Sequence, residues 1–192
     1  MRTITRLGIG LALVVALVLG WRLGSAQAST AVPIRTEVLA YEADADQIQM
    51  TRWAANRFER AGLQVPEVEI HFHEHLSDCR GHLGYALAGR IDLCTHLVDT
   101  PARRAILHEM GHIWLDEHFP VWERPRFLRL RDLSAWNSSK DPWNVRGYEQ
   151  GAEVMAWALG ERIMTPSIPD NGEGELRTAF RFLTGHGAPE KP

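Results

Sequence analysis

The chain has 192 residues, of which 45% are apolar and 23% are charged; these values are ordinary for a globular protein and exclude wholesale disorder. Its formal net charge of −3 falls to −6 once the first 28 residues are removed, because that segment contains three arginines and no acid. Beyond short pairs such as Arg103-Arg104 no block of basic residues remains. This argues against a nucleic-acid partner and against binding to anionic lipid through charge.

Residues 1–28 have the layout of a secretory signal peptide. A basic start with Arg2 and Arg6 precedes an uncharged apolar run, residues 8–21, and the Ala-Gln-Ala of residues 26–28 is the small-x-small pattern that signal peptidase reads. The apolar run is short for a membrane span. An uncleaved anchor, accommodated by tilt, is the alternative. Both interpretations predict an exported protein, secreted or associated with the cell envelope, and only the anchor predicts membrane contact.

Residues 29–43 are expected to form a flexible entry segment. From about residue 44 to residue 61 apolar residues recur at helical spacing, and Gly62 follows as a stop signal, so this segment predicts a helix. Residues 68–72 alternate between apolar and polar, which is typical of a strand with one buried face. The domain is therefore expected to span residues 44–185 and to be followed by a polar tail, residues 186–192.

Three histidines fall on the polar side of that strand: His71, His73 and His75. Alternating histidines can bind a metal ion, so an independent metal site is one interpretation. The simpler one is an exposed face of an edge strand.

A hairpin is expected next, with strands at residues 83–87 and 90–93 joined by a turn at Ala88-Gly89. Two cysteines, Cys79 and Cys94, flank it and are the only ones in the chain. In an exported protein two cysteines most simply form one disulfide. Two buried thiols are the alternative.

A helix is predicted from Thr100 to His118, with Thr100 as its N-cap, Pro101 in its first turn and a stop before Pro120. The following stretch, residues 119–146, is rich in Trp, Pro and Arg, with a short helix near residues 126–132. Long ordered loops are often functional, and Trp136 and Trp143 are candidates to line or cover a cleft.

Two further helices are expected to complete the domain. The first runs from about residue 147 to residue 164 and ends at Thr165-Pro166, and the second covers residues 173–183. No internal repeat and no second domain are evident.

The helix at residues 100–118 contains the motif H-E-x-x-H, from His108 to His112. Residues four apart on a helix differ by about 40° around its axis, so both imidazoles project from one face and can bind a single ion. Glu109 is placed to take a proton from a water whose pKa zinc lowers from about 15.7 towards 7. The motif therefore predicts a catalytic zinc ion (Zn²⁺) bound by His108 and His112, with Glu109 as general base. Two surface histidines without a metal are the alternative.

A catalytic zinc site needs a third protein ligand and one open position. His118 has the spacing of the third histidine in H-E-x-x-H-x-x-G-x-x-H, but that pattern turns the chain at a glycine and this chain has Leu115. A continuing helix would place His118 about 240° round from His112. The other candidate is Glu149, which shares a helical face with Glu153.

We expect these two acids to have different roles. Glu149 would bind zinc, and Glu153 would accept the N–H of a ligating histidine. The reverse assignment and a pair of solvated surface acids are both open alternatives. Tyr148, beside the proposed ligand, and Tyr85, in the hairpin, are candidates to stabilise the oxyanion of a tetrahedral intermediate.

Residues 90–114 resemble the strand–loop–helix unit of gluzincin metallopeptidases, and Glu149-x-x-x-Glu153 is similar to their glutamate ligand with an acid four residues later. Residues 149–166 also resemble the E-x-E-A-N-x-F-A…L-M-P stretch of the compact ImmA/IrrE-type minigluzincins. Gly151 replaces that family's second Glu and Glu153 its Asn, and this chain has an export signal. The resemblance covers about half of the mature chain and implies zinc, peptide-bond hydrolysis and a substrate extended along an edge strand.

The sequence therefore predicts a single α+β domain of zincin type, in which a small sheet packs on the helix that carries the histidines and a second, glutamate-bearing helix lies behind it. The expected function is an exported zinc metallopeptidase acting on a peptide or protein. A non-catalytic zinc-binding or partner-binding module on the same scaffold is the alternative. Substrate preference and oligomeric state are not encoded in any motif that we can identify.

Overall fold

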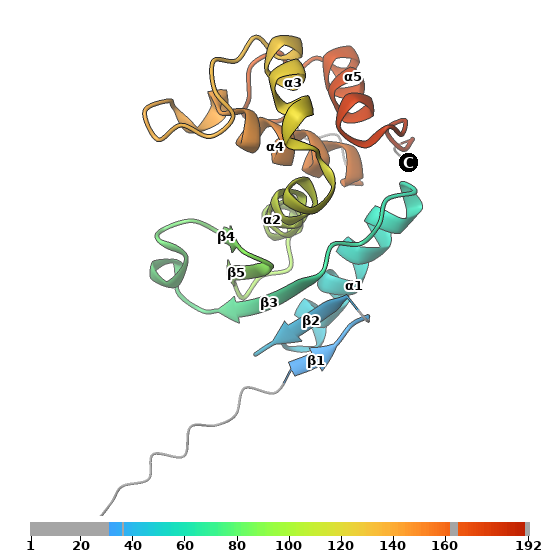
Figure 1. Ribbon diagram of the computed structural model, residues 1–192. Coiled ribbons are helices and arrows are strands. Elements are labelled where there is room, and N and C mark those ends of the chain that lie inside the picture. The colour runs from blue at the N-terminus through green and yellow to red at the C-terminus, as the bar shows by residue number, and fades with distance from the viewer. Residues whose placement is uncertain (1–30, 36, 162–164, 191–192) are drawn as a thin grey trace, which may run out of the picture.

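The computed structural model describes residues 31–35, 37–161 and 165–190 (Figure 1). The expected signal segment, residues 1–28, lies outside the described residues. Within them, none of the helices combines the length and the apolar character needed to cross a membrane.

A five-stranded sheet forms one layer, with the strand order β1-β2-β3-β5-β4. Strands β2, β3 and β5 run parallel, whereas β1 and β4 run antiparallel to their single neighbours. Among the described residues β4 is therefore an edge strand, and one side of its backbone pairs with no other strand. The strands are β1 (Ala31–Pro33), β2 (Val38–Tyr41), β3 (Val68–His73), β4 (Gly84–Leu87) and β5 (Arg90–Cys94).

Five α-helices in the described part of the chain cover one side of this sheet (Figure 1). Helices α1 and α2 lie closest to it, and α4 packs on the side of α2 that faces away from the strands, with α3 and α5 beyond (Figure 1). The helices are α1 (Ala45–Arg60), α2 (Thr100–His118), α3 (Arg124–Leu130), α4 (Gly147–Leu159) and α5 (Glu173–Thr184).

The period-two pattern of the strands fixes which face of the sheet is buried. Three apolar side chains are fully buried beneath the helices: Ile70 on β3, and Ile91 and Leu93 on β5. The alternate positions His71 and Asp92, which are register partners, are only partly buried on the opposite face. This arrangement confirms the predicted α+β domain, with the histidine helix between a small sheet and a glutamate-bearing helix.

Two details at the N-terminal end of the sheet differ from the sequence-based expectation. Residues 31–33 and 38–41, placed in a flexible entry segment, form β1 and β2 and extend the sheet. Consequently β3 is a central strand between β2 and β5 and not an edge strand. The apolar and polar residues of 31–41 alternate over too few positions to predict strands. These strands form because β2 pairs with β3 and β1 pairs with β2.

The helix ends differ as well. The N-cap of α2 is Asp99, whose carboxylate accepts the N–H of Ala102 at 3.0 Å, so Thr100 is already helical. Helix α4 ends at Leu159 and not near residue 164: Gly160 is extended, and the guanidinium of Arg57 binds the last helical carbonyl, that of Leu159. Residues 162–164 lie outside the described part of the chain.

Candidate metal centre

Helices α2 and α4 cross closely because glycines stand at the contact. A Cβ on Gly111 of α2 would lie 3.2 Å from the Cβ of Met155 and 3.3 Å from the Cα of Ala152 on α4. A Cβ on Gly151 of α4 would lie 2.8 Å from a side-chain methyl of Leu115 on α2. The absence of both side chains lets carboxylates on α4 reach imidazoles on α2.

His108, His112 and Glu149 bring three ligand atoms together at this crossing. The Nε2 atoms of His108 and His112 lie 3.1 Å apart. The Oε2 atom of Glu149 lies 3.3 Å from the Nε2 of His108 and 3.2 Å from that of His112. In a tetrahedral site with bonds of about 2.0–2.1 Å, two ligand atoms are about 3.3 Å apart, so the three atoms match one face of such a tetrahedron. The cluster can hold a metal ion.

The second ring nitrogen of His108 faces Glu153 at ion-pair distance. Its Oε1 lies 3.1 Å from the Nδ1 of His108, and its other oxygen binds the guanidinium of Arg104. Burial favours the neutral acid, but His108 and Arg104 outweigh it and lower the pKa of Glu153. The resulting anion places the proton of a neutral His108 on Nδ1 and leaves the Nε2 lone pair directed at the cluster.

The electrostatics of the cluster favour a cation. Burial alone would lower the pKa of His108, but hydrogen bonds to the carboxylates of Glu149 and Glu153 raise it to about 9. Conversely, burial opposes ionisation of Glu149, and the two histidines overcome it and lower its pKa. A proton on His108 therefore neutralises these carboxylates in the metal-free protein, and a metal ion can take over that role.

Glu109 lies beside the cluster and beneath the edge strand. Its side chain is buried, and a Cβ on Gly84 of β4 would be 2.7 Å from its Cγ and 2.8 Å from its Oε1. Burial raises the pKa of Glu109, while a hydrogen bond from the backbone of Ala86 acts in the opposite direction. Glu109 is thus a carboxyl group with increased basicity, held by β4 at the edge of the cleft.

A cleft of about 980 Å³ opens over these groups. The edge strand β4 and its flanking residues line one wall, and α2, α4 and the long loop at residues 131–146 line the rest. The ring of Trp143, from that loop, stacks 5.9 Å from the ring of His108, and the ring of Tyr148 lies 4.2 Å from that of His112. The cluster is therefore open to a large ligand and is not enclosed by protein on all sides.

The structure places the other candidate residues as follows. His118 is not part of the cluster: α2 continues unbroken through Leu115, and the His118 ring packs on Trp114 at 5.1 Å. The hydroxyl of Tyr148 donates to the Oδ2 of Asp116 at 2.7 Å and lies within the cleft. Tyr85 also lines the cleft, beneath the guanidinium of Arg80.

The strand histidines do not form a second cluster with three ligand atoms in the described residues. His71 stacks on Tyr41 with the ring centroids 4.4 Å apart. His73 instead contacts Asp92, with its Nε2 2.7 Å from a carboxylate oxygen. These two imidazoles serve separate contacts on the outer face of the sheet.

The expected disulfide between Cys79 and Cys94 is present. It connects the short 3-10 helix η1 (Leu76–Cys79) to the end of β5. Helix η1 comes shortly before β4 in the chain. The bridge thereby anchors the segment that delivers the edge strand to the cleft.

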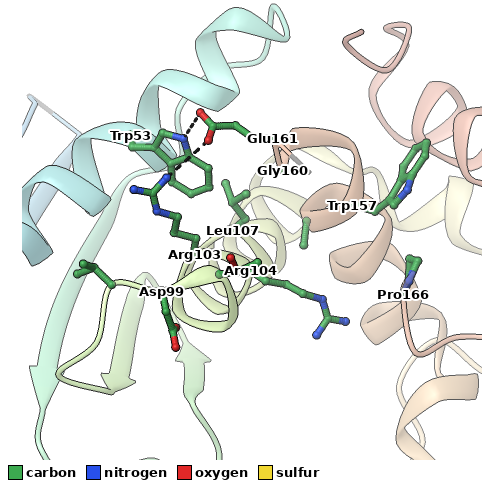
Figure 2. Close-up of a pocket in the computed structure, with 12 residues that line it drawn as sticks. Trp53, Asp99, Arg103, Arg104, Leu107, Trp157, Gly160, Glu161 and Pro166 are labelled. Atoms are coloured by element: carbon green, nitrogen blue, oxygen red, sulfur yellow. Dashed lines mark hydrogen bonds and ion pairs between the residues drawn. The ribbon is translucent and has the colours of Figure 1, made fainter. Parts of the chain in front are cut away.

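A second pocket of about 300 Å³ lies where α1, α2 and the end of α4 meet (Figure 2). Figure 2 shows the indole of Trp53 and the guanidinium of Arg103 directed at the carboxylate of Glu161, with N–O distances of 2.7 and 3.5 Å. Arg104 lines this pocket as well, but its guanidinium points away from that group (Figure 2). Because the Glu161 carboxylate is already bound, we place the candidate site in the larger cleft.

Sequence reasoning missed Arg104 and Gly84. Arg104 precedes His108 by four residues, so helical periodicity could have placed it on the same face as the imidazoles. Gly84 had no such signal, because its contact with Glu109 depends on how the sheet packs against α2.

The fold and the site together define an α+β protein with a three-residue cluster able to bind a metal ion. Comparisons with known protein families, with curated proteins and with solved structures find no match.

Proposed function

We propose that the protein is an exported zinc metallopeptidase of the gluzincin type. The observation that carries the proposal is the triangle of ligand atoms from His108, His112 and Glu149, with sides of 3.1–3.3 Å. Two imidazole nitrogens and one carboxylate oxygen are the ligand set of catalytic zinc sites that use two histidines and a glutamate.

The residues divide the chemistry between them. A bound zinc ion supplies a Lewis acid, which polarises a carbonyl and makes a water molecule acidic. Glu109 takes the proton of the attacking water and delivers it to the leaving amine, a role that suits a buried carboxylate whose pKa is raised. Glu153 holds the His108 ring in position through Nδ1, and Arg104 keeps Glu153 ionised.

Peptides are the substrates that suit this cleft best. The edge strand β4 lines it and has one side of its backbone free within the sheet. An extended peptide can pair with that side through main-chain hydrogen bonds, which require no particular side chains. Such pairing would bring a scissile carbonyl past Glu109, which lies against Gly84 and Ala86 of the same strand.

The cleft distinguishes this proposal from a structural zinc module. Structural sites are closed by four protein ligands, whereas catalytic sites keep one position open. Here the described residues supply three ligand atoms, and all three residues line a cleft of about 980 Å³. Export is supported by the signal-like leader together with the Cys79–Cys94 disulfide, which is typical of oxidising compartments.

The test is to purify the protein without residues 1–28, measure its metal content and incubate the zinc-loaded form with a diverse peptide library. We expect one zinc ion per chain and cleaved products. Glu109→Gln should retain zinc and lose turnover by at least about 100-fold, since general-base catalysis contributes about 10²–10⁴-fold. Stoichiometric zinc without any cleavage would indicate the non-catalytic module, and a fully active Glu109→Gln variant would refute the role of Glu109.

A further inference from the structure

One end of the cleft carries more positive than negative charge. Arg124, Arg146 and Asp116 line the cleft together with the uncharged Asn137; Arg124 packs on Trp136, and the segment after Arg146 binds the backbone of residues 135 and 136. We call these four polar residues the basic end of the cleft. The chain as a whole is acidic, so a local excess of guanidinium groups in the candidate site indicates a ligand of opposite charge.

Arg146 is half-buried and fixed in position. Its Nε and one terminal nitrogen donate to the carbonyl of Asp141 at 2.9 and 2.8 Å. The next two backbone N–H groups, of Gly147 and Tyr148, donate to the carbonyls of residues 135 and 136 at 3.0 and 2.7 Å. Arg146 forms no ion pair with any carboxylate of the described residues. A guanidinium has five N–H donors, and those not used by Asp141 are available to a ligand.

Arg124 packs on the indole of Trp136. Its guanidinium carbon is 4.8 Å from the centre of the Trp136 ring, and a terminal nitrogen is 3.6 Å from Oδ1 of Asp116. The other oxygen of Asp116 accepts the hydroxyl of Tyr148 at 2.7 Å. The buried Nε of Arg124 has no hydrogen-bond partner in the described residues. Asp116 thus pairs with one guanidinium, that of Arg124, and with the phenol of Tyr148, whereas Arg146 has no carboxylate partner among the described residues.

The basic end lies within reach of a substrate held at the metal cluster. Asp116 follows His112 by one helical turn, a rise of about 6 Å. Tyr148 spans the interval, since its ring is 4.2 Å from the His112 ring and its hydroxyl binds Asp116. An extended peptide advances about 3.4 Å per residue, so a group about two residues from the scissile bond reaches the basic end.

We propose that the basic end binds a carboxylate of the substrate, so that the enzyme prefers peptides with a negative charge about two residues from the cleaved bond. The planar fork of Arg146 matches a carboxylate, which it can bind through two parallel hydrogen bonds. The carboxylate comes either from an acidic side chain or from the peptide C-terminus. This proposal rests on the proposed function for its reference to cleavage, but the binding itself does not require catalysis.

The first experiment measures binding, with the zinc-loaded Glu109→Gln protein and fluorescein-labelled alanine hexapeptides. Each peptide carries a single glutamate or glutamine at its third, fourth or fifth position, and each is made with a free or an amidated C-terminus. Fluorescence anisotropy should show about 10- to 100-fold tighter binding for the charged member of one matched pair. A glutamate preference identifies a side-chain carboxylate, and an acid-over-amide preference identifies the C-terminus. Equal affinities throughout would overturn the proposal.

The second experiment assigns the preference to Arg146. Arg146→Gln should reduce the ratio between charged and uncharged peptides to about 1, because that variant removes the fork. Arg129→Gln is the matched control: Arg129 is exposed on α3, outside the cleft lining, and the ratio should not change. A purely structural role of Arg146 in the loop would weaken both peptides equally and leave the ratio intact, and that result would also overturn the proposal.

The same peptides, tested for cleavage by the wild-type protein, separate this proposal from the proposed function. Cleavage without any charge preference contradicts the carboxylate site and leaves the peptidase intact. A charge preference in binding without cleavage of any peptide supports the carboxylate site and contradicts the peptidase.

Discussion

Gly84→Ala should displace Glu109, the proposed general base, and leave the metal cluster intact. The added Cβ would lie 2.7 Å from Cγ and 2.8 Å from Oε1 of Glu109, whereas unstrained contacts of this kind begin near 3.4 Å. Either the Glu109 side chain or strand β4 must therefore move by about 0.6–0.7 Å. A misplacement of about 1 Å can reduce a rate by about 10²-fold, so we expect kcat/KM to fall by roughly 30- to 100-fold.

The assay compares kcat/KM on one cleaved peptide with zinc content measured on the same preparation. The three atoms nearest to the added Cβ all belong to Glu109 and none to His108, His112 or Glu149, so zinc content should stay at the wild-type value. Gly174→Ala is the matched control, since an added Cβ there meets no atom within 4 Å. A Gly84→Ala protein with wild-type kcat/KM would show that β4 does not hold Glu109 in position, and a loss of zinc would show that the strand supports the metal cluster instead.

Three further perturbations test the metal cluster and its frame. In a chelator competition, Glu149→Ala should weaken zinc binding by roughly 100-fold or more, which exceeds the loss of about 10–100-fold expected for a residue that only supports a ligand. His118→Ala should leave zinc binding unchanged. The opposite ranking would favour His118 as the ligand. Replacing Cys79 and Cys94 by Ala should lower the free energy of unfolding in urea by about 3 kcal/mol, given their sequence separation of 15. Because the pKa of His108 is raised to about 9, the contribution of this group to the stability of the metal-free protein should be complete below about pH 6.5. It should be lost, by up to about 3 kcal/mol, as the pH rises through 9. The zinc-loaded protein should lack this decline, since zinc replaces the proton, and identical pH profiles for the two forms would contradict the assignment.

Local signals carried the prediction of α2. Its end before Pro120 and the shared face of His108 and His112 follow from periodicity and the helical repeat. The structure has the helix at Thr100–His118, with its N-cap one residue earlier than predicted, at Asp99. The strand at residues 68–72 and the hairpin after it were similarly predictable because their side-chain alternation or turn residues are local.

The remaining features depend on contacts between segments that are distant in the sequence. Helix α4 ends early because Arg57, from α1, binds the carbonyl of Leu159. Strands β1 and β2 exist because β3 offers them an edge, which no pattern within residues 31–41 could reveal. The contact of Gly84 with Glu109 belongs to the same class, since it arises only when β4 packs on α2.

The cluster itself shows how the two kinds of information combine. The helical repeat alone brings two imidazoles to one side of α2, but it cannot select Glu149 over Glu153 as the third ligand, because both share a face of α4. The selection follows from where α4 crosses α2. With Gly111 and Gly151 at the crossing, Glu149 reaches both Nε2 atoms, while Glu153, one turn further, reaches the Nδ1 of His108 and the guanidinium of Arg104. A Cβ at Gly111 would lie 3.3 Å from the Cα of Ala152 and would push α4 away, whereas a Cβ at Gly151 would meet only the end of the flexible Leu115 side chain. The geometry of the cluster is therefore a property of the helix crossing, and Gly111 is the glycine that keeps the two backbones close.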